Sequence, residues 1–255
     1  MSWGKFCGQL LGALLKIAVI GWFYIFLARL LMFFSLRHSS VHYCIIVFLY
    51  LSFLSLLIVW YIKKEDSRNT FSLHDVPWRI GLWAFLLYIS EFLFIAVFYG
   101  NPVLIPKSMI TTEYILRTIN PIFFAPVVEE IVFRGLLQKN LLLKIAPWIA
   151  ILITSVLFAL IHLNRFEAIL PAFLLGICCG IIYYKTGKLI VCILFHSFSN
   201  ILAAATGFTF VYFPFLQIFY LILAIGLATY SIRGFLNYKT ENKNPMQDYS
   251  YSFNQ

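Results

Sequence analysis

Long apolar runs separated by short polar stretches extend along almost the whole chain. A helix needs about 20 apolar residues to cross the hydrocarbon core of a bilayer. The runs predict eight membrane-spanning helices, with bounds near 11–35, 41–62, 79–99, 113–138, 148–163, 167–184, 189–206 and 211–232. The predicted fold class is therefore all-α, a polytopic bundle of about eight transmembrane helices.

The composition agrees with this pattern and excludes a soluble globular enzyme. Of the 255 residues, 62% are hydrophobic and only 11% are charged, and the mean hydropathy is +0.90. Soluble domains carry about a quarter charged residues. The formal net charge of +9 does not indicate nucleic-acid binding, because the basic residues lie singly or in pairs between apolar runs. The partner expected of such a surface is the lipid bilayer.

The basic residues also predict the orientation of the chain. With a cytoplasmic N-terminus, twelve Lys and Arg residues fall in cytoplasmic segments, and four fall outside: Arg37, Lys107, Arg117 and Arg165. Cytoplasmic loops carry the excess of basic residues, so both termini are predicted to be cytoplasmic. The richness in Phe, Ile, Leu, Lys, Asn and Tyr is typical of an AT-rich bacterial genome, which indicates a bacterial cell membrane.

Ionisable residues inside the predicted spans are costly and usually have a specific role. Lys16 and Arg29 lie on the first span, where their long stems let the charged ends reach opposite membrane surfaces. Glu91 is the one acidic residue in the third predicted span, and we expect it to have a structural role there.

The fourth span carries a denser cluster. Residues four apart share a helix face, so Glu130 is expected to pair with Arg134. Glu129 points about 100° away and has no partner in its own helix. Such a carboxylate in a low-dielectric site is suited to act as a general base, and Pro126 disturbs the preceding turn in a way that favours a polar pocket. The alternative is an ion-paired helix with a structural role only.

Two later spans add polar groups of the same kind. Phe158 and His162 lie one turn apart on the fifth span, and His196 and Asn200 lie one turn apart on the seventh. Each polar group needs a partner in the hydrocarbon, and these groups satisfy one another if they meet. Counted from the cytoplasmic ends of the predicted spans at about 1.5 Å per residue, Glu129 lies about 15 Å deep, His196 about 12 Å and His162 about 21 Å. These depths allow the three side chains to meet near mid-bilayer.

These motifs together resemble one protein family. Glu-Glu-x-x-x-Arg at 129–134, Phe-x-x-x-His at 158–162 and His-x-x-x-Asn at 196–200 occur in this order on separate apolar helices. The pattern is similar to that of the CPBP family, also called the Abi or CAAX-protease-like family, which includes the type II CAAX-prenyl endopeptidase. The resemblance divides the chain into residues 1–112 with three helices and a cytoplasmic loop, a four-helix catalytic core at 113–206, and a last helix with a polar tail at 207–255.

The resemblance implies a role for each matching residue. Glu129 matches the general base that activates a water molecule, and His162 matches the residue that helps to position that water. His196 and Asn200 match the pair that polarises the scissile carbonyl and holds the oxyanion. Two residues match supporting positions: Glu130 and Arg134.

Metal use is open at this point. Glu129, His162 and His196 form a carboxylate-plus-two-histidine set, which is typical of catalytic Zn²⁺ with one open position. The family is usually described as metalloproteases. The same residues also suit a metal-free mechanism with a glutamate base and histidine and amide donors.

The resemblance implies an integral membrane endopeptidase that hydrolyses a peptide bond in a membrane-bound or lipid-associated peptide or protein. Its role would be CAAX-type trimming, maturation of a secreted peptide, bacteriocin immunity or control of the cell envelope. One alternative is a non-proteolytic regulator that binds a sensor kinase or a secretion partner. Another is a proton-coupled carrier, against which the missing inverted-repeat pattern argues.

Overall fold

Eight continuous helical stretches of eight or more residues form most of the computed structural model of the chain. The structure describes residues 3–35, 40–65, 71–73, 76, 78–110, 112–163, 166–209 and 213–237. The stretches comprise α1 (Trp3–Ser35), α2 (Ser40–Glu65), α3 (Trp78–Tyr99), a segmented helix over 112–141, α7 (Pro147–Leu160), α8 (Phe166–Thr186), α9 (Leu189–Ala205) and α10 (Pro214–Asn237). The predicted all-α polytopic fold is confirmed. The polar tail after residue 237 lies outside the described residues.

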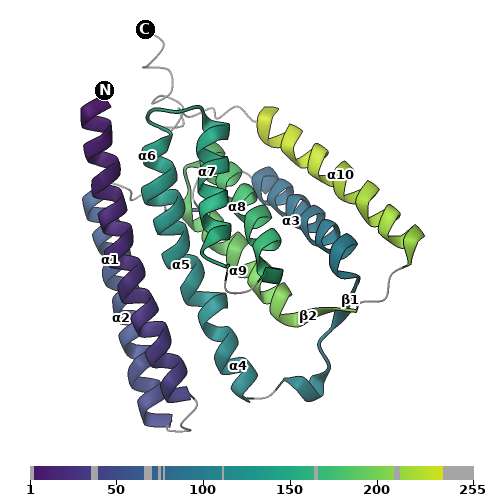
Figure 1. Cartoon of the computed structure of the whole chain (residues 1–255), viewed down its shortest axis with the longest axis horizontal. Helices are drawn as coiled ribbons and strands as arrows, with labels where there is room; N and C mark the ends of the chain where they lie inside the picture. The colour runs from purple at the N-terminus through teal and green to yellow at the C-terminus, as the bar shows by residue number, and fades with distance from the viewer. Residues whose placement is uncertain are drawn as a thin grey trace.

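The helices form a bundle in which the segmented helix and α7–α9 are central (Figure 1). α1 and α2 lie together on one side, and α3 packs with α10 on the other (Figure 1). α1 begins and α10 ends at the same end of the bundle, at the top of Figure 1, as an even number of crossings requires. Which side is cytoplasmic stays a prediction.

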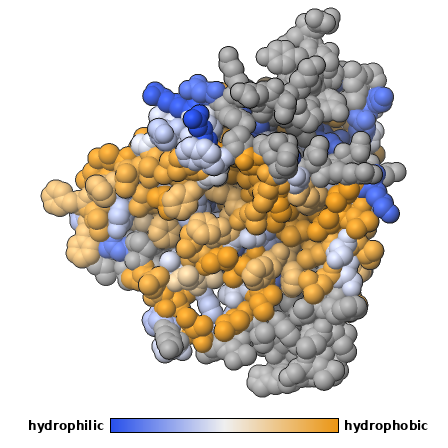
Figure 2. Space-filling view, turned by 180° about the vertical axis from the view of Figure 1, so that it is seen from behind, coloured by the Kyte–Doolittle hydropathy of each residue, from blue (hydrophilic) through white to orange (hydrophobic). Residues whose placement is uncertain are grey.

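The surface is that of a protein in contact with lipid. Among the described residues, four helical segments are long and apolar enough to cross a membrane: Gly4–Gly21, Trp78–Tyr99, Phe166–Thr186 and Pro214–Asn237. Large apolar side chains such as Leu56, Phe166 and Phe215 are exposed. The face drawn in Figure 2 is broadly hydrophobic, with most hydrophilic residues towards its upper edge. Exposing such a large apolar surface to water is unfavourable, so this surface faces the lipid of a bilayer.

The segmented helix changes its winding twice. It runs through α4 (Thr112–Ile119), the π-helical η3 (Asn120–Phe124), α5 (Ala125–Glu130), the π-helical η4 (Ile131–Gln138) and α6 (Lys139–Leu141). In η3 the Ala125 N–H bonds the Asn120 carbonyl five residues back. Such wide turns are rare and are often found at functional sites. The disturbed turn expected before Pro126 is therefore present, and the two glutamates lie between the two π-helical segments.

Two predicted spans run past the C-terminal ends of their helices. The predicted span 148–163 is too long, because α7 ends at Leu160 and His162 lies in the turn that follows. The predicted span 189–206 also runs too far, because Thr206 is extended and opens β2 (Thr206–Thr209). β2 pairs with β1 (Asn101–Leu104) in an antiparallel ribbon that the apolar pattern did not predict.

α7 and α8 approach closely at two glycines of α8. A Cβ on Gly176 would lie 3.0 Å from the Cα of Ser155, and one on Gly180 would lie 2.9 Å from a methyl carbon of Ile151. Small residues four apart let helix backbones approach in membranes. This contact fixes the position of α8 against the helices that carry the polar cluster.

We expect Gly176→Ala to destabilise the fold by about 1–3 kcal/mol, because the added methyl group meets the backbone of Ser155. The loss is measured as a lower midpoint of thermal unfolding of the full chain in detergent. Gly226→Ala in α10 is the matched control, because a Cβ there meets no atom within 4 Å. If Gly176→Ala and Gly226→Ala unfold at the same midpoint, the close contact between α7 and α8 is contradicted.

Candidate active site

A fully buried ion pair lies at the junction of α5 and η4. The Nε atom of Arg134 lies 3.2 Å from Oε2 of Glu130, and both side chains have no exposed area. The guanidinium also donates to the Gly176 carbonyl at 2.7 Å and lies 5.1 Å from the ring centre of Phe158. The pairing predicted from the four-residue spacing is present. The hydrogen bond to α8 and the ring contact with α7 show that this pair also joins three helices.

His196 of α9 connects the two glutamates. Its Nδ1 lies 2.9 Å from Oε1 of Glu130, and its Nε2 lies 3.8 Å from Oε2 of Glu129. A carboxylate only accepts, so Nδ1 carries the proton that bonds Glu130. This bond fixes the orientation of the imidazole and directs Nε2 towards Glu129.

The two neighbouring glutamates are in different surroundings. Glu130 is held by Arg134 and His196 and is fully buried. The side chain of Glu129 is 16% exposed and interacts electrostatically with His196 and with His162. Glu129 is thus the more exposed of the two carboxylates, and the close ion pair with Arg134 belongs to Glu130, as the helix geometry predicted.

His162 reaches the same cluster from the turn after α7. Its ring centre lies 5.1 Å from that of Phe158, which in turn lies 5.6 Å edge-on from the ring of His196. Its Nδ1 lies 2.9 Å from the Phe158 carbonyl oxygen. A carbonyl only accepts, so Nδ1 is the donor and Nε2 carries the lone pair in the neutral ring.

Asn200 lies one turn after His196 on α9. Its Nδ2 donates to the Pro121 carbonyl at 2.6 Å. In the π-helical register this carbonyl would bond the N–H five residues on, but that residue is Pro126, which has no N–H. Asn200 therefore satisfies a carbonyl that Pro126 leaves open. An amide nitrogen has two N–H groups, so this bond uses one of them.

Sequence reasoning missed the residues that hold the cluster in register. Gln138 donates to the Gly180 carbonyl at 2.9 Å, just as Arg134 donates to that of Gly176, so both bonds join residues 42 apart. Tyr61 of α2 donates to the Gly135 carbonyl at 3.1 Å. The Gly-x-x-x-Gly spacing at 176–180 is the signal that would have indicated the first contact.

Glu91 forms a contact between α3 and α8. It is 6% exposed, and Cys178 Sγ lies 3.8 Å from its Oε2. A contact with a neighbouring helix is what the structural role expected of Glu91 requires.

The predicted zinc ligands do not form a ready metal site. In both histidines Nδ1 is bonded, which leaves Nε2 as the atom that a metal would use. Among the residues that the structure describes, however, no three His, Cys, Asp or Glu side chains are placed to hold one ion together. Zn²⁺ binding by Glu129, His162 and His196 stays a prediction.

The fold and the site together define a class: a polytopic helical membrane protein with a buried carboxylate–histidine cluster. Residues 111–202 match the family described as type II CAAX prenyl endopeptidase Rce1-like. This match covers the segmented helix, α7, α8 and most of α9, and it includes all three motifs. The family resemblance based on the motifs is therefore confirmed. The chain matches no curated protein and no solved structure significantly.

Proposed function

We propose that this protein is an intramembrane endopeptidase in which Glu129 activates the attacking water. The observation that carries the proposal is that two adjacent glutamates have different surroundings. Glu130 is neutralised by Arg134 and fixes His196, whereas Glu129 faces the same imidazole with its carboxylate partly exposed. The match to an endopeptidase family over 111–202 supports this chemistry.

The reaction needs only side chains of this cluster and a water molecule. Glu129 removes a proton from water, and the resulting hydroxide adds to the carbon of the scissile carbonyl. The C–N bond then breaks as Glu129 returns the proton to the leaving nitrogen, which gives a carboxylic acid and an amine. Positioned N–H groups stabilise the oxyanion in a site from which bulk water is largely excluded.

Two side chains are suited to supply these N–H groups. His196 places Nε2 on the side of Glu129, because its Nδ1 is held by Glu130, and an N–H at this position would donate to the oxyanion. Asn200 keeps one amide N–H besides the one that binds Pro121. His162, close enough to interact electrostatically with Glu129, is suited to position the water through its Nε2.

The substrate class we propose is a peptide or protein anchored in the same membrane, which includes C-terminal CAAX-type trimming. The test uses the full chain in liposomes with a fluorogenic peptide carrying a farnesyl anchor and the same peptide without it. We expect cleavage of the anchored peptide and much slower cleavage of the free one. If wild-type protein cleaves neither peptide nor any other membrane-anchored peptide tried, the regulator alternative is favoured.

The same assay tests the metal question. Because the proposed steps use only side chains of the chain itself, namely those of Glu129, His162, His196 and Asn200, we expect a strong chelator to leave the cleavage rate unchanged. Metal content of the purified chain is measured in parallel by mass spectrometry. Stoichiometric zinc, together with loss of activity on chelation and recovery on zinc addition, would contradict the metal-free mechanism.

A further inference from the structure

α1 and α2 lie on the side of the bundle away from α3 and α10 (Figure 1). Side chains of these two helices line an apolar groove. Its volume of about 510 Å³ lies within the range of small-molecule sites. Eight residues line it: Leu15, Lys16, Val19, Ile20, Phe53, Leu56, Leu57 and Trp60. Among these eight residues, Lys16 is the one that carries a charge.

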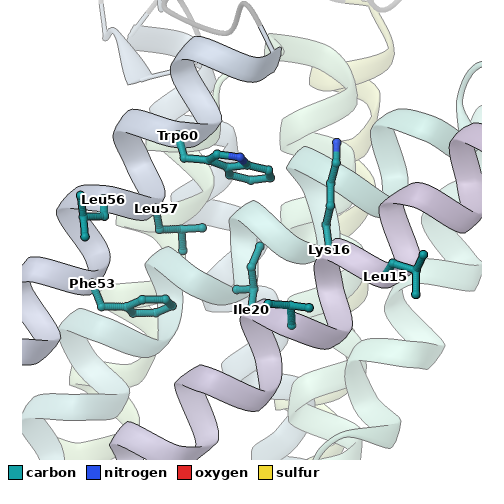
Figure 3. A pocket seen from close by; sticks show the side chains of 8 residues that line it. Leu15, Lys16, Ile20, Phe53, Leu56, Leu57 and Trp60 are labelled. Carbon is teal, nitrogen blue, oxygen red and sulfur yellow. The ribbon is translucent and has the colours of Figure 1, made fainter.

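The groove has two chemically different ends. Figure 3 shows the Lys16 ammonium extending to the level of the Trp60 ring, while Phe53 and Ile20 lie towards the other end. Lys16 Nζ lies 5.5 Å from the ring centre of Trp60. A lysine beside a tryptophan is typical of the level of the lipid headgroups, where both side chains bring an apolar body and a polar tip.

The walls of the groove are arranged for a lipid chain. Ile20 and Leu57 are buried and form its floor, whereas Val19 and Leu56 are 69% and 70% exposed and form its rim. An acyl chain lying between these walls would cover apolar floor that the two helices leave open. Its headgroup would then lie at the end marked by Lys16.

We propose that this groove binds one acyl chain of an anionic phospholipid, with the lipid phosphate at Lys16 and Trp60. Charge complementarity selects this occupant over a zwitterionic lipid, because a lysine near the surface attracts anionic headgroups. The bound lipid would support the candidate active site from outside. Tyr61, the residue after Trp60, donates to the carbonyl of Gly135, which follows Arg134.

The test uses the full chain reconstituted in phosphatidylcholine bilayers that contain a minor fraction of brominated lipid. Bromine on an acyl chain quenches the fluorescence of a nearby tryptophan, and the difference from Trp60→Phe isolates the signal of Trp60. We expect brominated phosphatidylglycerol to occupy the groove about fivefold more readily than brominated phosphatidylcholine, the factor given by one lysine–anionic headgroup contact. Lys16→Gln should abolish this preference, and Lys16→Arg should keep it.

Two further variants complete the design. Arg29→Gln removes an exposed charge from the same helix outside the groove and should keep the preference. Val19→Phe narrows the groove from its exposed rim and should reduce phosphatidylglycerol retained during purification, as measured by native mass spectrometry. Equal quenching of Trp60 by both brominated lipids in wild-type protein, or an unchanged preference in Lys16→Gln, would overturn the proposal. These readouts require no proteolytic activity, so they stand apart from the proposed function.

Discussion

Replacing Glu129 by glutamine is expected to lower kcat by about 10²–10⁴-fold, the usual contribution of a general base. The amide keeps the shape of the side chain but cannot take the proton of the attacking water. Its side chain is partly exposed, and the close ion pair with Arg134 belongs to its neighbour, so the variant should fold and insert normally. The measurement is the initial rate of cleavage of the anchored peptide at saturating concentration.

Glu167→Gln is the matched control for this loss. Glu167 is an exposed glutamate in the first turn of α8 and stands outside the cluster of Glu129 and His196. It receives the same substitution and should retain the wild-type rate. If Glu129→Gln cleaves the peptide at the wild-type rate while accumulating normally in the membrane, Glu129 is not the base.

Replacing Glu130 by glutamine is expected to destabilise the protein by about 3–5 kcal/mol, because it leaves the buried guanidinium of Arg134 without its counter-ion. The remaining bond to Gly176 and the contact with Phe158 do not neutralise the charge. The measurement is the free energy of unfolding in a denaturing detergent. Glu129→Gln, the same substitution one residue earlier, should cost far less.

A double-mutant cycle separates the ion pair from the other contacts of Glu130. Arg134→Met alone should destabilise the protein by a similar amount, because it leaves Glu130 as the unpaired buried charge. The double variant Glu130→Gln/Arg134→Met should be more stable than the sum of the two losses predicts. Strict additivity would show that the two side chains do not stabilise each other.

The sequence predicts those parts of the site that depend on spacing along one helix. The pairing of Glu130 with Arg134 follows from a four-residue separation, and the separate orientation of Glu129 follows from the same helix geometry. That His196 joins the glutamates follows from the cost of unsatisfied polar groups in lipid. Long apolar runs likewise predict the eight helical stretches.

The parts that were not predicted depend on how separate helices pack. Arg134 and Gln138 bond carbonyls 42 residues away because Gly176 and Gly180 bring α7, α8 and η4 close together. The β1–β2 ribbon and the end of α7 before His162 depend on contacts between segments distant in sequence. Hydrophobic periodicity contains no information on such contacts.

The bond between Asn200 and Pro121 combines a feature that the sequence predicts with one that it does not. The missing N–H of Pro126 can be read from the sequence, and so can an open carbonyl near it. Which carbonyl is open depends on the π-helical register of η3, because an α-helical register would leave a different one free. Asn200 therefore makes a structural contact that the sequence does not predict, and its role at the oxyanion stays a prediction.

The central claim is that a water molecule activated beside Glu129 and His196 cleaves a peptide bond within the membrane. Its most direct test is hydrolysis of the anchored peptide by the reconstituted protein in ¹⁸O-labelled water, with both products identified by mass spectrometry. We expect a new carboxyl group carrying one ¹⁸O atom and a new free amine, formed by wild-type protein and lost in Glu129→Gln. Absence of these products with wild-type protein, or their equal formation by Glu129→Gln, would contradict the account.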